Sequence, residues 1–425
     1  MDTITHGVAG ALIGKAFFAD WAAKYARTSE VSVGMSLALA PNGPASVTLA
    51  EEMGPTQRLS ARAAGRFAIF ATTLGSLFPD GDVAFGWIEG NNLATLELHR
   101  GWTHSFACMP LLALLLAVLT RWVARRIGWF APPLGFLTVA FAAGITSHIV
   151  LDLVTSFGTM IWSPFSNARA AWDLAFILDF VMSAIVVLPQ LAAQVYQAKN
   201  RGGNWRRRAQ EFLGITSGGA LVVWWLARSV GVGFSFWVLA ASIGVLAGFF
   251  FLPAIGGWGF RVTRARWCRA GVVGLAAYLG LCALAHERAL ERVEEFAKLQ
   301  GLKVESMGAL PAPPSLKYWT GLVRTPDGVY QSRINLWSSE RPAFDFFADS
   351  PPNRWIDAAK QLAAVKTYLW FARFPVFRTF RENARAVVEM SDLRFFAQRR
   401  GPIAFTYRVE FDANGRVRTE RWVRE

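Results

Sequence analysis

The chain has 425 residues, of which 53% are hydrophobic and 17% charged, and its formal net charge is +14. This composition is too apolar for an ordinary soluble protein and is typical of a polytopic membrane protein that carries some soluble part. The Lys and Arg residues cluster between apolar runs, as they do in membrane loops, so the charge does not indicate nucleic-acid binding. Cys108, Cys268 and Cys282 form no CxxC pair, which argues against a thiolate metal site or a redox motif.

Apolar runs that approach the length needed to cross a bilayer, roughly 20 helical residues, recur along the first two thirds of the chain. The first of them, ITHGVAGALIGKAFF, is rich in small residues, and the second is interrupted by Pro79 and two carboxylates. Residues 24–65 lie between these two runs and read as a long flexible loop, because polar and turn-forming residues dominate them. We expect eight membrane helices, at about 4–22, 66–84, 102–122, 132–154, 173–196, 212–230, 234–258 and 269–286.

Basic clusters predict how this bundle is oriented, because cytoplasmic loops carry an excess of Lys and Arg. The clusters fall in every second loop. Arg228 lies on the wrong side of the pattern, and the outer loop around Arg100 and Arg169 is also basic. A topology with eight spans and both termini outside the cytoplasm satisfies them. We therefore expect the C-terminal region to lie on the outer, non-cytoplasmic side of the membrane.

The character of the sequence changes after about residue 287. HERALERVEEFAKLQG predicts a charged amphipathic helix that leaves the membrane, and ALPAPPSLKYW predicts a proline-rich linker. The turn sequences PDG and ANG each lie between alternating arms and predict two β-hairpins, with a helical interruption near RWIDAAKQLAAVKTYLWFARF. The expected fold is mainly α: a transmembrane helical domain at 1–290, a linker at 291–311, and a small β-rich (α+β) extramembrane domain at 312–425.

Ionisable residues collect at the outer ends of the first five predicted helices. Four of the five histidines and six carboxylates lie there, and the three later helices hold almost none. Such groups are costly within a membrane and usually mark a functional or paired site. The residues are Asp2, His6, Asp80, Asp82, His99, His104, His148, Asp152, Asp173 and Asp179.

The spacing of these residues sharpens the prediction. His148 and Asp152 are four apart, so a helix puts both on one face and within reach of one ion. Asp80 and Asp82 follow Pro79, where a helix must break, so both carboxylates can turn toward one centre. His99 and His104 are five apart and do not share a helix face, so His99 is expected on the entering loop and His104 on the first turn.

Imidazole and carboxylate without thiolate are the ligands of Zn²⁺, Mn²⁺ or Fe²⁺ in catalytic sites with an open position. Arg100 is suited to hold an anionic oxygen beside them. Each residue alone also has an ordinary interpretation: His6 as an interfacial hydrogen-bonding residue, Asp173 as a helix N-cap. Asp179 lies within an apolar run, where burial without a partner is costly. Only the joint cluster predicts a metal.

The ordered motifs MDTITHGVAGALIG, LFPDGD, HRGWTHS, HIVLDLVTSFGTMIWSPFS and WDLAFILD resemble the YdjM family of bacterial inner-membrane, metal-dependent hydrolases over about the first 180 residues. That family is similar, more distantly, to zinc phospholipase C and related zinc nucleases that hydrolyse phosphate esters. The resemblance implies metal ligation by His6, Asp80, His104, His148 and Asp152. It also implies that Asp82, His99 and Asp179 are further ligands or support the ligands.

These observations favour a metal-dependent hydrolase of phosphate esters, with lipid phosphates among the candidate substrates, that acts at the periplasmic face. The ion polarises the ester, Arg100 binds its anionic oxygen, and Asp82 or Asp179 takes the proton. One alternative is a non-enzymatic membrane protein with a structural metal site and an outer domain that binds a partner. A third is a metal or proton transporter, which the confinement of the polar groups to one face disfavours.

Overall fold

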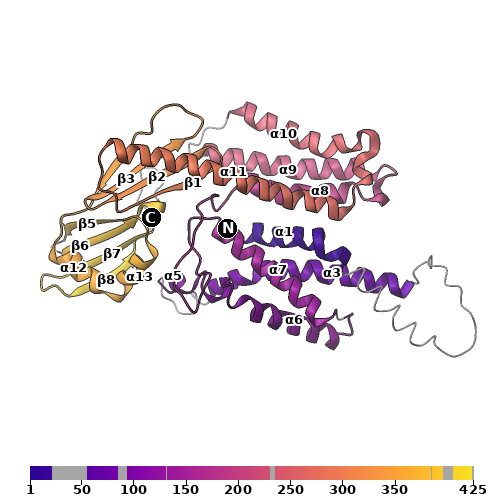
Figure 1. Cartoon of the computed structure of the whole chain (residues 1–425), viewed down its shortest axis with the longest axis horizontal. Helices are drawn as coiled ribbons and strands as arrows, with labels where there is room; N and C mark the ends of the chain where they lie inside the picture. The colour runs from indigo at the N-terminus through magenta and orange to yellow at the C-terminus, as the bar shows by residue number, and fades with distance from the viewer. Residues whose placement is uncertain are drawn as a thin grey trace, which may run out of the picture.

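The computed structural model describes residues 1–21, 55–84, 93–130, 132–229, 235–383, 385–395 and 405–423. Most of the predicted loop at 24–65 lies outside these residues, but its last part is helical, because the third helix begins at Pro55. The N-terminal part of the chain is a bundle of helices, and the C-terminal part holds two sheets (Figure 1).

Each of the eight ranges in which we expected a membrane helix contains one. Short 3₁₀ or π-helical turns continue or connect several of them. The elements of the bundle are α1 (Thr3–Ile13), η1 (Gly14–Phe18), α3 (Pro55–Leu77), η2 (Phe78–Asp82), α5 (Ala94–Leu98), η3 (Trp102–His104), α6 (Met109–Arg126), α7 (Leu134–Leu153), α8 (Phe180–Val195), η4 (Ala198–Asn200), α9 (Asn204–Ser229), α10 (Phe236–Phe251), η5 (Leu252–Arg261) and α11 (Arg264–Leu299).

The prediction of eight membrane spans is wrong by length and composition. Among the described residues, three helical segments are long and apolar enough to cross a membrane: α7, α10 together with η5, and α11. A fourth results if α6 is joined to the bent segment Leu96–His104. The other helices are shorter or more polar: α1 has 11 residues and α8 has 16, whereas α3 and α9 each carry three Arg residues in their N-terminal half.

Small residues let α1, α3 and α7 pack closely. A Cβ atom at Gly10 would lie 2.5 Å from the carbonyl oxygen of Thr72, and one at Gly75 would lie 2.7 Å from that of Phe141. A Cβ at Gly144 would meet the Thr72 carbonyl as well. Backbones that approach this closely are typical of helix contacts in membranes. The contact brings the start of α1, the end of α3 and the end of α7 to the same end of the bundle.

The C-terminal region folds into two antiparallel four-stranded sheets with strand orders β1-β2-β3-β4 and β5-β6-β7-β8. Both predicted hairpins are confirmed: the PDG turn joins β2 to β3, and the ANG turn joins β7 to β8. The predicted helical interruption is α12 and α13. The bounds are β1 (Ser306–Ala312), β2 (Tyr318–Thr325), β3 (Gly328–Asn335), β4 (Asp345–Ala348), α12 (Arg354–Gln361), α13 (Ala363–Phe371), β5 (Pro375–Glu382), β6 (Arg385–Asp392), η6 (Leu393–Phe395), β7 (Thr406–Phe411) and β8 (Val417–Trp422).

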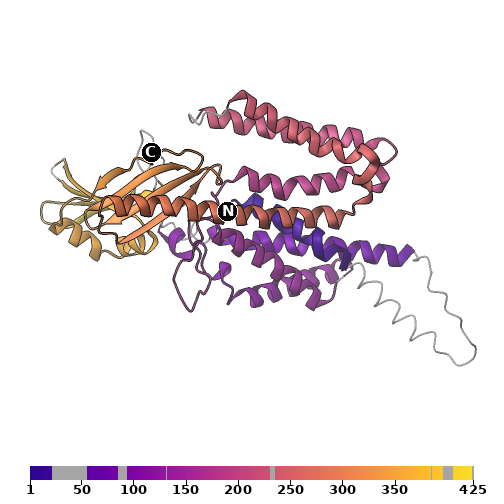
Figure 2. The ribbon, with the colours of Figure 1, turned by 45° about the horizontal axis from the view of Figure 1, so that its top comes forward.

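Helix α11 links the two parts, since its 36 residues run from the bundle to the first sheet (Figures 1 and 2). It extends through residues that the sequence suggested as a linker. The sheets lie beyond the end of the bundle at which the N-terminus and the start of α1 are found, in both views. Leu93, just before α5, and Leu96 of α5 pack into the core of the second sheet, with Tyr368 and Phe371 of α13. The C-terminal domain therefore covers this end of the bundle.

Candidate metal centre

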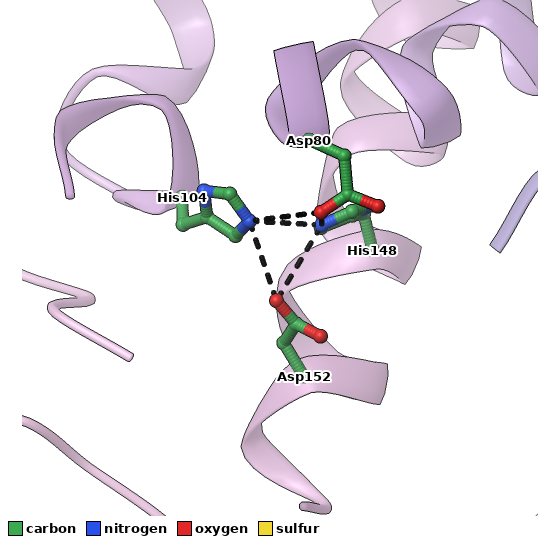
Figure 3. Close-up of side chains that lie close together, drawn as sticks. All are labelled: Asp80, His104, His148 and Asp152. Atoms are coloured by element: carbon green, nitrogen blue, oxygen red, sulfur yellow. Dashed lines mark hydrogen bonds and ion pairs between the residues drawn. The ribbon is translucent and has the colours of Figure 1, made fainter. Parts of the chain in front are cut away.

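Four predicted ligands meet at the end of the bundle that the C-terminal domain covers. Asp80 lies on η2, where Pro79 ends α3, and His104 ends the short turn η3. His148 and Asp152 lie on the last turns of α7, one turn apart on the same face, as their spacing predicted. Figure 3 shows the four side chains pointing toward a common point from three separate segments.

The ligand atoms of these four residues lie close together. His104 Nε2 is 3.0 Å from His148 Nε2, and these two nitrogens are 3.3 and 3.5 Å from Oδ2 of Asp152. Oδ1 of Asp80 lies 3.8 Å from His104 Nε2 and 3.5 Å from His148 Nε2. The side chains of the two histidines and of Asp152 are fully buried, and that of Asp80 is 13% exposed.

The contacts of Nδ1 in His148 and in His104 show which ring nitrogen of each histidine carries a proton. His148 Nδ1 lies 2.7 Å from the carbonyl oxygen of Ser76, and because a carbonyl only accepts, Nδ1 carries the proton. His104 Nδ1 lies 3.2 Å from Oδ2 of Asp82, which likewise accepts. When both rings are neutral, the two Nε2 atoms therefore present lone pairs to each other at 3.0 Å. Only a proton or a cation between them relieves this repulsion.

The oxygen ligands point to the cation. No hydrogen-bond donor in the described part of the chain is aligned with Oδ2 of Asp152, although this atom is buried. A buried carboxylate oxygen without a donor is costly. Two nitrogen lone pairs and two carboxylate oxygens that face one another make a ligand set for a divalent metal. The residues present therefore fit such an ion.

His6, the fifth predicted ligand, lies one layer behind these four. Its Nε2 is 3.1 Å from Oδ1 of Asp152, the oxygen that points away from the centre, and its ring stacks on that of His148 at 3.7 Å between centroids. The amine of Met1 and the guanidinium of Arg100 contact the same oxygen at 2.5 and 2.9 Å. These three groups fix the orientation of the Asp152 carboxylate.

Asp82 connects His99 to His104. Its Oδ1 accepts from His99 Nδ1 at 2.8 Å, and its Oδ2 accepts from Thr103 Oγ1 at 2.8 Å and from the backbone N–H of Arg100 at 3.1 Å. Asp82, His99 and His104 also form a second group with ligand-like spacing. Burial raises the pKa of Asp82, but hydrogen bonds from His104 and His99 outweigh it and hold the pKa below its usual range. The Asp80 pKa is lowered in the same way, by His104 and His148 against burial.

The other two predicted site residues have different surroundings. Arg100 is buried, and besides Asp152 it donates to Thr155 Oγ1 at 3.0 Å. Asp179 caps α8 through the backbone N–H groups of Val181 and Met182, and its Oδ2 accepts from Tyr278 and Ser315 at 2.6 Å each. None of these Asp179 partners belongs to the four-residue group. Asp173 pairs with Arg373 of the C-terminal domain.

Several groups that shape the centre could not be identified from the sequence. The carbonyl of Ser76 sets the tautomer of His148, and the ring of Phe157 lies 4.9 Å from the guanidinium carbon of Arg100. A backbone carbonyl has no sequence signature, and one phenylalanine among 33 has none either. Both become visible only when the loops are placed in three dimensions.

Residues 43–239 match the family model described as YdjM inner membrane protein. The match confirms the resemblance that the motifs suggested, and it includes Asp80, His104, His148 and Asp152, whereas His6 lies outside it. Neither the curated proteins nor the solved structures contain a match to the chain.

Proposed function

We propose that this chain, which matches the YdjM inner membrane protein family over residues 43–239, is a membrane-embedded, metal-dependent hydrolase. The observation that supports it most is the convergence of two imidazole nitrogens and two carboxylate oxygens, all acceptors, in a buried cluster. Asp80, His104, His148 and Asp152 would hold the ion.

Zinc is the metal that the spacing favours. Four ligands about 2.0–2.1 Å from a tetrahedral zinc ion lie about 3.3–3.4 Å from one another. The five separations given above range from 3.0 to 3.8 Å and centre on that value. A square-planar site would place some neighbours much farther apart than others. The ligand types also suit Mn²⁺ or Fe²⁺, which the sequence left open.

The surrounding residues orient the ligands. Ser76 and Asp82 fix the tautomers of His148 and His104, as the partners of metal-bound histidines usually do. Arg100 and His6 hold the Asp152 carboxylate so that Oδ2 faces the centre. When bound, the ion supplies Lewis acidity and lowers the pKa of water.

The proton acceptor in this proposal is His99, whose ring centroid lies 5.6 Å from that of His104. Its side chain is 18% exposed, and its Nδ1–H is bonded to Asp82, so Nε2 is the basic nitrogen. Asp82 then orients a base instead of serving as one, since its oxygens already accept from His99, Thr103 and the Arg100 backbone. This arrangement is that of a carboxylate-supported general base.

Phosphate esters are the proposed substrate class, because a divalent ion and nearby basic groups suit an anionic ester. Trp102, Trp162 and Phe165 lie exposed on the loops that carry or pack on η3, and exposed aromatic residues are typical of the membrane–water interface. The proposed location of the site is therefore the periplasmic surface of the inner membrane, where a lipid phosphate can reach it.

Hydrolysis of bis-p-nitrophenyl phosphate and of a labelled phospholipid by the purified chain tests this function. The change His148→Ala removes a ligand and should abolish turnover while the protein still folds. The matched control is His286→Ala, since His286 lies against Trp319 and not in the cluster. Turnover that survives His148→Ala, or none in the zinc-loaded wild type with either substrate, would contradict the proposal.

A structural metal site is the second candidate, and the burial of the ligands favours it: only Asp80 among the four is measurably open to solvent. In that case His148→Ala lowers the unfolding temperature, and zinc-loaded wild type hydrolyses neither ester. The outer domain would then serve to bind a partner. Activity and stability measured on the same preparations separate the two candidates.

A further inference from the structure

We infer that the C-terminal domain is part of the metal centre, and that Phe157 is the positioning residue through which it acts. The inference rests on the proposed metal site. It concerns a chain of contacts that joins Asp152 to the second sheet.

The first link is Arg100. Its guanidinium contacts Oδ1 of Asp152 at 2.9 Å, so it restrains the carboxylate whose other oxygen faces His104 and His148. Arg100 Nη1 also donates to Thr155 Oγ1 at 3.0 Å, whereas Nε has no hydrogen-bond partner among the described residues, so packing and not hydrogen bonding holds the Nε edge of the guanidinium plane.

The second link is the ring of Phe157, which supports that plane. The guanidinium carbon of Arg100 lies 4.9 Å from the ring centroid, within the range of a cation–π contact. The ring of His99 lies 5.8 Å from the same ring. Phe157 thus touches both the residue that orients Asp152 and the histidine bonded to Asp82. Its place is on the loop that leaves α7 just beyond Asp152.

The third link is the C-terminal domain, whose aromatic residues surround the outer side of Phe157. The ring of Phe371 in α13 lies 5.0 Å from it, and those of Phe395 and Phe405 lie 6.4 and 6.5 Å from it. Arg394 donates to the carbonyl oxygen of Ser156 at 3.1 Å and so holds the backbone next to Phe157. Phe157 is therefore held by residues that follow it by more than 200 positions, together with Arg169 of its own loop, whose guanidinium carbon lies 5.3 Å from the ring centroid.

Two further contacts dock the domain on the same loop. Arg373 forms a two-pronged pair with Asp173, at 3.0 and 2.9 Å, and Trp370 Nε1 donates to the carbonyl oxygen of Asn167 at 3.2 Å. Trp370 is 38% exposed and the Arg373 side chain is 36% exposed, so both can be changed without opening the core of the domain. They offer a way to loosen the docking while Phe157 stays intact.

If the C-terminal domain serves only to bind a partner, a different result is expected. Its docking would then hold the two parts together without altering the affinity of the cluster for metal. Zinc affinity is therefore the quantity that separates a positioning role from a merely structural one.

The experiment measures zinc affinity of the full chain by competition with a chromogenic chelator. Phe157→Ala breaks the second link, and the undocking variant, Trp370→Ala with Arg373→Gln, loosens the third. Both should bind zinc about 10- to 100-fold more weakly, the usual effect of removing a residue that supports a ligand. Combining them should weaken binding no further than Phe157→Ala alone, because they act along one path. Phe165→Ala is the matched control, since this phenylalanine of the same loop is 84% exposed, and it should bind as wild type does.

Folding is checked on each variant by thermal unfolding of the zinc-loaded protein. If Phe157→Ala does not fold, the undocking variant decides the matter. Folded variants with wild-type zinc affinity would overturn the inference. A wild-type chain that binds no zinc would instead overturn the proposed function, so the two failures are distinct.

Discussion

Close contact between α3 and α7 is required for the metal centre, and Gly75→Ala tests this requirement. Gly75 is buried on α3 one turn before η2, which carries Asp80, and it faces the backbone of Phe141 on α7. The same stretch of α3 provides the Ser76 carbonyl that binds His148 Nδ1. Any separation of the two helices at this point therefore moves Asp80 and Ser76 away from His148.

The size of the displacement follows from the contact. An added Cβ would lie 2.7 Å from the Phe141 carbonyl oxygen, whereas ordinary contact begins at 3.4 Å, so the helices must separate by about 0.7 Å. Metal–ligand distances tolerate only about 0.2 Å of change. We expect zinc affinity to fall at least about tenfold, as it does when ligand support is lost. Overpacking of this kind also costs about 1–3 kcal/mol of stability.

The assay pairs Gly75→Ala with Gly135→Ala on α7, where an added Cβ meets nothing within 4 Å. Zinc affinity and unfolding temperature are measured for both and for the wild type. The control should retain its zinc affinity, because the new methyl group points into open space. A Gly75→Ala protein with unchanged zinc affinity and unfolding temperature would refute the reasoning.

Three further predictions follow from the same structure. Asp152→Asn removes a charged ligand, so the metal content measured by elemental analysis should fall to background. It also leaves Arg100 buried without its counter-charge, so the free energy of unfolding measured with a chemical denaturant should fall by about 3–5 kcal/mol. Chelation of the wild type should lower its unfolding temperature, since an ion present at about 1,000 times its Kd stabilises by about 4 kcal/mol; an unchanged temperature counts against a bound metal. In the second sheet, Arg385 holds the pKa of Glu410 below its ordinary 4.5, against burial. The stability that this ionised carboxylate contributes is present above pH 4.5 and is lost as the pH falls below it. Calorimetry should therefore show that Glu410→Gln loses less stability at acid pH than the wild type does. Parallel stability–pH profiles of the two proteins would contradict this.

The ligands were predictable from the sequence because the chemistry of the residues is local. His148 and Asp152 are four residues apart in a helix and therefore share one face. Pro79 forces the helix break that turns Asp80 inward. The hairpins were predictable for the same reason, since PDG and ANG are turn sequences between alternating arms. The number of spans was not, because it depends on where each helix begins and ends: α8 has only 16 residues, and α3 begins early enough to include three Arg residues in its N-terminal half.

The roles of individual side chains within the site depended on long-range packing. His6 matches the motif of a ligand, yet its Nε2 reaches the outer oxygen of Asp152, because α1 packs against α7 at that height. Arg100 and Asp179 have partners that lie far from them in the sequence, Asp152 in one case and Tyr278 in the other. No spacing rule joins such pairs.

X-ray absorption at the zinc edge of the metal-loaded chain measures the coordination shell directly. We expect one zinc per chain, with only nitrogen and oxygen neighbours at about 2.0–2.1 Å, two of them from imidazoles. The signal should vanish in the protein with both His104→Ala and His148→Ala. A sulfur neighbour at about 2.3 Å, or equal zinc content in that double variant, would contradict the assignment of Asp80, His104, His148 and Asp152 as the ligands.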